Sequence, residues 1–242
     1  MTGDRVQIKN TTLYHGDCRD VIGGLTFDAV VTDPPYGLGS HAKRSFDRFT
    51  KTRNLHGGGT WAANPIYKDI DWDEEAPDLT FLLERNVPMI IFGGNYFVLP
   101  PSRKWIIWDK GEQFYRRTFA EAELAYCNFD GNVRIYKCGT EFNSGFVHQK
   151  PVKVHPTQKP VRVMEYCISE LPKGQGNIIC DPYMGSGTTG VACVRMGRAF
   201  VGIERTRKYF ESACRRIEQA YTEYNNQFPE VRKMIETKGL FI

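Results

Sequence analysis

Residues 177–204 read NIICDPYMGSGTTGVACVRMGRAFVGIE and contain two short apolar runs separated by a glycine-rich turn. The runs at 177–181 and 199–204 have the length and composition of buried β-strands, and the stretch from about 187 to 197 is typical of a helix that begins at the turn. Strand, turn, helix and strand in this order predict a parallel strand pair joined by a crossover helix.

The glycine-rich turn suits a ligand that contains a nucleoside. Gly185, Gly187 and Gly190 have the spacing GxGxxG, which lets the backbone approach a ligand at a helix N-terminus. Glu204 follows Gly185 by 19 residues, where a carboxylate can accept hydrogen bonds from ribose hydroxyls. Only 52 residues follow Gly190, so we expect the other strands of the sheet to precede the turn. This order counts against a dehydrogenase, and the absence of a lysine after the glycines excludes a P-loop.

The rest of the chain extends the same alternating pattern. Apolar runs at 28–32, 88–94 and 104–108 predict further strands, and 160–171 and 205–220 read as amphipathic helices. We therefore expect an α/β fold with a doubly wound, mostly parallel sheet in a single domain, 1–242. Two intervals lack this pattern. We interpret 37–80 as a long functional loop and 126–154 as a small β-rich insertion.

The composition narrows the class of protein. The net charge is +4, and the seven cysteines are scattered singly, which argues against a disulfide framework and a structural zinc site. Most of the cysteines are expected to be small buried hydrophobes. We find neither a membrane-spanning run nor a signal sequence, and we expect a cytoplasmic protein without a metal.

A second candidate site follows the apolar run 28–32, where the sequence reads Asp33-Pro34-Pro35-Tyr36. Open α/β sheets bind ligands at the carboxyl ends of their strands. Asp33 and the carbonyl of Pro34 could both accept hydrogen bonds from an exocyclic amino group, which would direct its nitrogen lone pair outward. Tyr36 offers a flat face for stacking.

Three motifs together resemble those of a known family. DPPY at 33–36, HPTQKP at 155–160 and DPYMGSGTTG at 181–190 are similar to the motifs of the amino-group DNA methyltransferases, which use S-adenosylmethionine. Their order resembles the circularly permuted β group, in which the catalytic motif precedes the cofactor motif. The resemblance extends over residues 14–210 and implies a Rossmann-like methyltransferase sheet.

The resemblance also implies roles for individual residues. The catalytic residues would be Asp33, Pro34, Pro35 and Tyr36. The residues expected to bind the cofactor are Asp17, Cys18, Asp33, Thr157, Gln158, Lys159, Pro160, Asp181, Tyr183, Gly185, Ser186, Gly187, Thr188, Thr189 and Glu204. The family usually has Phe where this chain has Tyr183. The segment Phe92-Gly93-Gly94-Asn95 is similar to one beside the catalytic pocket.

The implied reaction is methyl transfer to N6 of an adenine that is flipped out of double-stranded DNA. Within the family, Asp as the first residue of the catalytic motif leans toward adenine and Ser toward cytosine. A cytosine-N4 DNA methyltransferase or an RNA methyltransferase stays open, as does a catalytically silent nucleic-acid-binding module.

Basic residues suggest where DNA would be contacted. Residues 40–56 alone carry a net charge of +4, which suits phosphate contact or closure over a flipped base. The residues expected to contact DNA are Lys43, Arg44, Arg48, Lys51, Arg53, Arg116 and Arg117, the last two in a second basic group with Arg103 and Lys104. The interval 126–154 is expected to recognise the target sequence. Its shortness favours a brief or relaxed site, or help from a second subunit in a homodimer.

Overall fold

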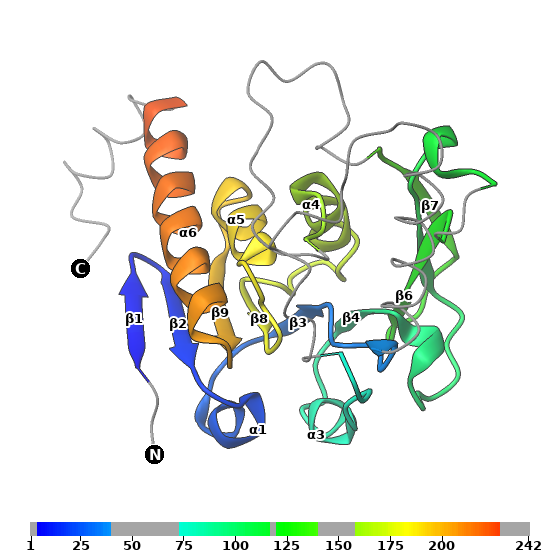
Figure 1. Ribbon diagram of the computed structural model, residues 1–242, viewed down its shortest axis with the longest axis horizontal. Helices are drawn as coiled ribbons and strands as arrows, with labels where there is room; N and C mark the ends of the chain where they lie inside the picture. Colours follow the sequence, from blue (N-terminus) through cyan, green and yellow to red (C-terminus); the bar gives the residue numbers. More distant parts are fainter. Residues whose placement is uncertain (1–3, 40–72, 117–119, 140–157, 228–242) are drawn as a thin grey trace, which may run out of the picture.

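The computed structural model describes residues 4–39, 73–116, 120–139 and 158–227. Within these ranges the strands form one sheet in the order β1-β2-β9-β8-β3-β4-β6-β5-β7 (Figure 1). The strands are β1 (Arg5–Ile8), β2 (Thr11–His15), β3 (Ala29–Thr32), β4 (Met89–Phe92), β5 (Trp105–Asp109), β6 (Ala122–Cys127), β7 (Arg134–Lys137), β8 (Ile178–Asp181) and β9 (Ala199–Glu204). The helices are α1 (Cys18–Val21), α3 (Thr80–Leu83), α4 (Val161–Ser169), α5 (Thr188–Arg195) and α6 (Arg207–Gln227), with 3-10 turns η1 (Ile22–Gly24), η4 (Gly94–Tyr96) and η5 (Glu112–Phe114).

The centre of the sheet is parallel, as the apolar runs predict. Strands β2, β9, β8, β3 and β4 pair in parallel, and β5 pairs with β7 in parallel. Antiparallel pairing is found between β1 and β2 and between β6 and both of its neighbours. The prediction of a mostly parallel α/β sheet is confirmed.

Helices cover both faces of this sheet, and they bury the side chains of the central strands on either side. Val31 and Ile90 pack in a cluster with residues of α4, α5 and α6, whereas Val30 and Ile91 pack with residues of α1 and α3. Figure 1 shows these two groups of helices on opposite faces of the sheet. The fold is therefore doubly wound, and in such folds ligands bind at the carboxyl ends of the strands.

The glycines of the turn also serve the packing of α5. Gly187 has a φ of +79°, and a Cβ placed there would lie 2.9 Å from the Cβ of Ala213 in α6. A Cβ at Gly190 would lie 2.6 Å from Ile217 in α6 and 2.8 Å from Phe200 in β9. Two of the three glycines thus allow α5 to lie close to its neighbours, in addition to any role at a ligand.

The described part of the interval 126–154 belongs to the main sheet. Tyr126 and Cys127 end β6, which lies between β4 and β5 and is buried, and residues 134–137 form β7 beside β5. Of these two strands, β7 lies at an edge of the sheet, with Ile135 exposed, whereas β6 lies inside it. Residues 140–154 of the predicted insertion lie outside the described residues.

The cysteines behave as the sequence predicts. All seven are free thiols, and five are buried: Cys18, Cys127, Cys167, Cys180 and Cys193. In the described part of the chain, no cluster of His, Cys, Asp and Glu side chains has the composition of a metal site. None of the described helices is both long and apolar enough to cross a bilayer.

Candidate active site

A cavity of about 440 Å³ lies at the carboxyl ends of β3, β8 and β9. The residues expected from the sequence that line it are Asp17, Cys18, Asp33, Pro34, Pro35, Tyr36, Gln158, Lys159, Asp181, Tyr183, Gly185, Ser186, Thr188, Thr189 and Glu204. Pro160 and Gly187 do not line it, and Thr157 lies outside the described residues. The tertiary structure thus brings the DPPY turn and the glycine-rich turn to one cavity, although Asp181, the first residue of the second motif, follows Tyr36 by 145 positions.

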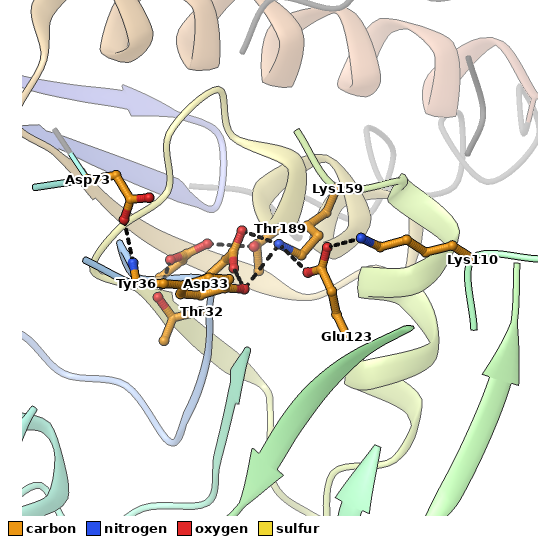
Figure 2. Close-up of polar contacts among 9 residues, drawn as sticks. Thr32, Asp33, Tyr36, Asp73, Lys110, Glu123, Lys159 and Thr189 are labelled. Carbon is orange, nitrogen blue, oxygen red and sulfur yellow. Dashed lines mark hydrogen bonds and ion pairs between the residues drawn. The ribbon is translucent and has the colours of Figure 1, made fainter. Parts of the chain in front are cut away.

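Both carboxylate oxygens of Asp33, the residue that follows β3, have a donor (Figure 2). The hydroxyl of Tyr36 donates to Oδ1 at 2.5 Å, and Nζ of Lys159 lies 2.5 Å from Oδ2. Burial raises the pKa of the Asp33 carboxyl, and the ammonium of Lys159 opposes that rise. Burial likewise raises the pKa of Tyr36, which keeps its hydroxyl neutral as a donor.

Lys159 joins Asp33 to a second buried carboxylate. Its Nζ lies 3.0 Å from Oε2 of Glu123, whose other oxygen lies 2.7 Å from Nζ of Lys110. The Lys159 side chain is 6% exposed, and that of Glu123 is 20% exposed. Burial by itself would raise the pKa of Glu123, but Lys159 and Lys110 outweigh it and lower that pKa to about 2. The four groups form an alternating chain of charges: Asp33, Lys159, Glu123 and Lys110.

Strand direction explains why Glu123 and Lys110 reach this site. Because β6 is antiparallel to β4, its first residues lie at the edge where the parallel strands end. Strand β5 runs the other way, with Trp108 opposite Glu123, so that Lys110 follows at the same edge. Neither residue belongs to a motif, and no local signal in the sequence would have identified them.

The DPPY turn is also held from the segment that precedes α3. Oδ1 of Asp73 accepts the backbone N–H groups of Tyr36 and Gly37, at 2.6 and 2.9 Å. The ring of Tyr36 stacks on Tyr96, with 5.0 Å between the centroids and 16° between the planes. Tyr96 is 45% exposed. The face that the sequence suggests for stacking is therefore in contact with a second aromatic ring.

Gly93 is required where β4 turns beside Tyr36. It has a φ of +67°, and a Cβ there would lie 2.2 Å from Cε1 of Tyr36. We expect Gly93→Ala to lower the free energy of unfolding by about 2–4 kcal/mol, because backbone strain and collision with the ring add. Urea unfolding measures this change.

Gly197 supplies the matched control for that substitution. Its φ of +66° is nearly the same, and nothing lies within 4 Å of a Cβ built there. Gly197→Ala should therefore show only the backbone cost, about 1 kcal/mol. Equal losses of stability in the two variants would contradict the collision.

Asp181, at the end of β8, holds the glycine-rich turn in place. Its carboxylate accepts the hydroxyls of Thr32 and Thr189, at 2.7 and 2.5 Å, and the N–H of Tyr183 at 3.1 Å. Burial raises its pKa to about 6, although these hydrogen bonds oppose the rise. The hydrogen bond between Asp181 and Thr189 therefore ties the start of α5 to the end of β8 and fixes the glycine-rich turn between them.

Glu204 and Ser186 tie the turn to β9 and α6. Oε2 of Glu204 accepts the N–H of Gly185 at 3.0 Å, and Oε1 accepts the N–H of Thr206 at 2.7 Å. Burial raises the pKa of Glu204. Arg216 donates to both the carbonyl and the hydroxyl oxygen of Ser186, at 2.6 and 2.8 Å. Each carboxylate oxygen of Glu204 still has acceptor capacity for a ligand.

Asp17 and Cys18 lie at the other wall of the cavity, at the start of α1. Oδ1 of Asp17 accepts the N–H of Arg19 at 2.9 Å, which caps the helix, and the side chains of these two residues form an ion pair of 2.7 Å. Cys18 is buried, which raises the pKa of its thiol to about 11. It therefore contributes a neutral thiol at neutral pH.

The basic residues expected to contact DNA are only partly described. Lys43, Arg44, Arg48, Lys51, Arg53 and Arg117 lie outside the described residues. Arg116 has a φ of +59°, and its N–H donates to Glu121. Arg103 is exposed and pairs with Asp130 at 3.2 Å. The expectation that Lys104 belongs to a basic group that contacts DNA is wrong, because Lys104 is only 8% exposed and pairs with Glu170 at 2.9 Å.

Comparisons of the sequence with known proteins agree on one class. The family model N6_N4_Mtase, described as DNA methylase, matches residues 137–215. The type II methyltransferase M2.MboI of Moraxella bovis is 25% identical over 270 residues, which cover 94% of this chain and 95% of the relative. The type II methyltransferase M2.DpnII of Streptococcus pneumoniae is 47% identical over 64 residues, which cover 26% of this chain and 24% of the relative.

Two solved structures are similar to this chain in fold. A crystal structure of the M1.HpyAVI–SAM complex has a TM-score of 0.50 at 25% identity, with 85% of this chain and 99% of that chain covered. The PvuII DNA methyltransferase, titled cytosine-N4-specific, has a TM-score of 0.54 at 14% identity, with 94% and 96% covered, and shows the likeness of fold alone.

Proposed function

This chain belongs to the amino-group DNA methyltransferases of the N6/N4 type, and from this premise we propose that it methylates N6 of adenine in double-stranded DNA. One observation carries the proposal. The Asp33-Pro34-Pro35-Tyr36 turn and the glycine-rich turn with Glu204 line the same cavity, so that an amino group and a methyl donor could meet there.

The residues of the cavity fit the cofactor of this family, S-adenosylmethionine, which supplies a methyl group on a positively charged sulfonium when bound. Eight acidic and three basic side chains line the cavity, a balance that favours a cationic ligand. Glu204 would accept hydrogen bonds from the ribose hydroxyls, and Gly185 leaves room for the backbone to approach the ligand. Asp17, Cys18 and Tyr183 would line the wall beside the base of the nucleoside.

Asp33 and the carbonyl of Pro34 would accept the two protons of the target amino group. That arrangement favours a more tetrahedral nitrogen whose lone pair points away from the acceptors, toward the methyl donor. Lys159 and the Tyr36 hydroxyl hold the Asp33 carboxylate in place and oppose the rise of its pKa that burial causes, and its remaining lone pairs can accept the amino proton. Transfer would form an N–C bond as the S–C bond of the donor breaks, and the methylated nitrogen would then release one proton, which the Asp33 carboxylate could accept. No strong base is needed before the attack.

The target base must leave the duplex to reach Asp33. Tyr36 and Tyr96 provide aromatic faces beside the carboxylate, on which a flipped base could stack. We propose phosphate contacts from the basic residues of the interval 37–80 and from Arg116, and recognition of the target sequence by the interval 126–154. The order of the motifs along the chain favours the circularly permuted arrangement.

A transfer assay with tritiated S-adenosylmethionine tests the proposal. The substrate is double-stranded DNA that lacks modification, and digestion to nucleosides then identifies the methylated base. We expect label in N6-methyladenine. Label in N4-methylcytosine would overturn the choice of adenine. In a parallel reaction with RNA in place of DNA, label there and none in DNA would overturn DNA as the substrate. Cofactor binding without any transfer would support a silent binding module.

A further inference from the structure

We propose that Glu123 is a positioning residue for methyl transfer, because it shares the ammonium of Lys159 with Asp33 and so sets how strongly Asp33 accepts hydrogen bonds. The inference rests on the proposed function, since it assigns Asp33 to the target amino group. It concerns a residue that lies outside every motif of the sequence.

The geometry of Lys159 carries the inference. Its Nζ lies 2.5 Å from Asp33, 3.0 Å from Glu123 and 3.4 Å from the hydroxyl of Tyr36 (Figure 2). The ammonium of Lys159 donates to Asp33 and to the Tyr36 hydroxyl, whereas Oε2 of Glu123, 3.0 Å away and buried, has no hydrogen-bond partner among the described residues and interacts with it as an ion pair. Because Lys159 is 6% exposed, water competes little for these donors. Its position therefore depends on the two carboxylates on either side of it.

Because Asp33 and Glu123 share the single positive charge of Lys159, that charge neutralises each carboxylate less than it would neutralise one alone. With Glu123 neutral, Lys159 would interact with Asp33 alone, and Asp33 would become a weaker acceptor for a proton of the target amino group. Lys110 has the opposite effect, because it pairs with Glu123 at 2.7 Å and reduces the pull of Glu123 on Lys159. Such effects are strong at this site because the groups are largely removed from water.

The charged groups around Asp33 fix the sign of the pH dependence. Lys159 and Tyr36 contact Asp33 directly, Glu123 faces it from β6 across Lys159, and Asp181 faces it from the end of β8. The negative charge of Glu123 raises the pKa of Asp33, and Lys159 lowers it. Loss of the Glu123 charge should therefore lower the pKa of Asp33.

The decisive variant is Glu123→Gln, measured as kcat against pH at saturating DNA and S-adenosylmethionine. The plateau of kcat should fall roughly 10-fold, because the weaker acceptor favours the reactive geometry of the amino group less. The acid limb of the profile should move about one pH unit lower. Glu123→Asp should return the limb toward its original position, because it restores the charge. Glu84→Gln is the control, since Glu84 is exposed at the end of α3 and does not line the cavity, and its profile should equal that of the wild type.

Lys110→Gln tests the inference with the opposite sign and does not depend on whether Glu123→Gln folds. Without Lys110, Glu123 interacts more strongly with Lys159, and the acid limb should move to higher pH. Limbs that stay unchanged in both variants, or move in the same direction, would overturn the inference. Failure of the proposed function is recognised separately, because the wild-type protein would then not methylate adenine in DNA at any pH.

Discussion

Asp33→Ala is expected to abolish methyl transfer to DNA, with kcat reduced roughly 1,000-fold or more. The substitution removes the carboxylate that would accept a proton of the target amino group. It leaves Lys159 paired with Glu123, so no charge is left buried without a partner. Transfer of tritiated methyl groups under single-turnover conditions measures the loss.

Cofactor binding by Asp33→Ala should stay within a few-fold of the wild type, although Asp33 is among the residues expected beside the cofactor, because most of the expected contacts come from the glycine-rich turn and Glu204. Glu204, Gly185 and Asp181 hold the glycine-rich turn through contacts that do not include Asp33. Titration calorimetry with S-adenosylmethionine checks this expectation. Asp130→Ala is the control, because Asp130 is an exposed aspartate that pairs with Arg103. Turnover close to that of the wild type in Asp33→Ala would overturn the assignment of Asp33.

Lys159→Met is expected to lower the free energy of unfolding by about 3–5 kcal/mol at neutral pH. The change leaves Asp33 without a cation and with only the Tyr36 hydroxyl as a partner, while Glu123 keeps Lys110. Methyl transfer should fall as well, because neither carboxylate is then held in place. Urea unfolding measures the stability, and Lys173→Met, at an exposed lysine, provides the control.

The loss of stability in Lys159→Met should be largest near neutral pH and smaller at acid pH. Without the ammonium, the pKa of Asp33 in the folded protein rises further above its value in the unfolded chain. The folded state then binds more protons, so stability falls as pH rises through this range, and the deficit shrinks toward acid pH. The double variant with Asp33→Asn should regain stability at neutral pH but remain inactive. A deficit that is independent of pH and is not relieved in the double variant would contradict this account.

Much of the fold follows from local patterns in the sequence. The apolar run 28–32 forms β3, and the runs at 177–181 and 199–204 form β8 and β9, because their β-branched and apolar side chains are buried on both faces of the sheet. The glycine-rich turn also lies between β8 and α5 as predicted. The interval 126–154 lacks such a clear pattern, because the buried end of β6 is followed directly by exposed and polar residues.

The sequence by itself predicted the doubly wound, mostly parallel sheet and the two turns that carry the DPPY and glycine-rich motifs. Those features depend on strand periodicity, on glycine at positions with positive φ and on contiguous motifs, all of which are local. Only the tertiary structure decided that Glu123, Lys110 and Asp73 lie around the DPPY turn. Glu123 and Lys110 reach the turn because β6 is inserted antiparallel between β4 and β5, and Asp73 reaches it because the chain comes back to the turn just before α3. A buried charge thus acquires its partners from long-range pairing rather than from its neighbours in sequence.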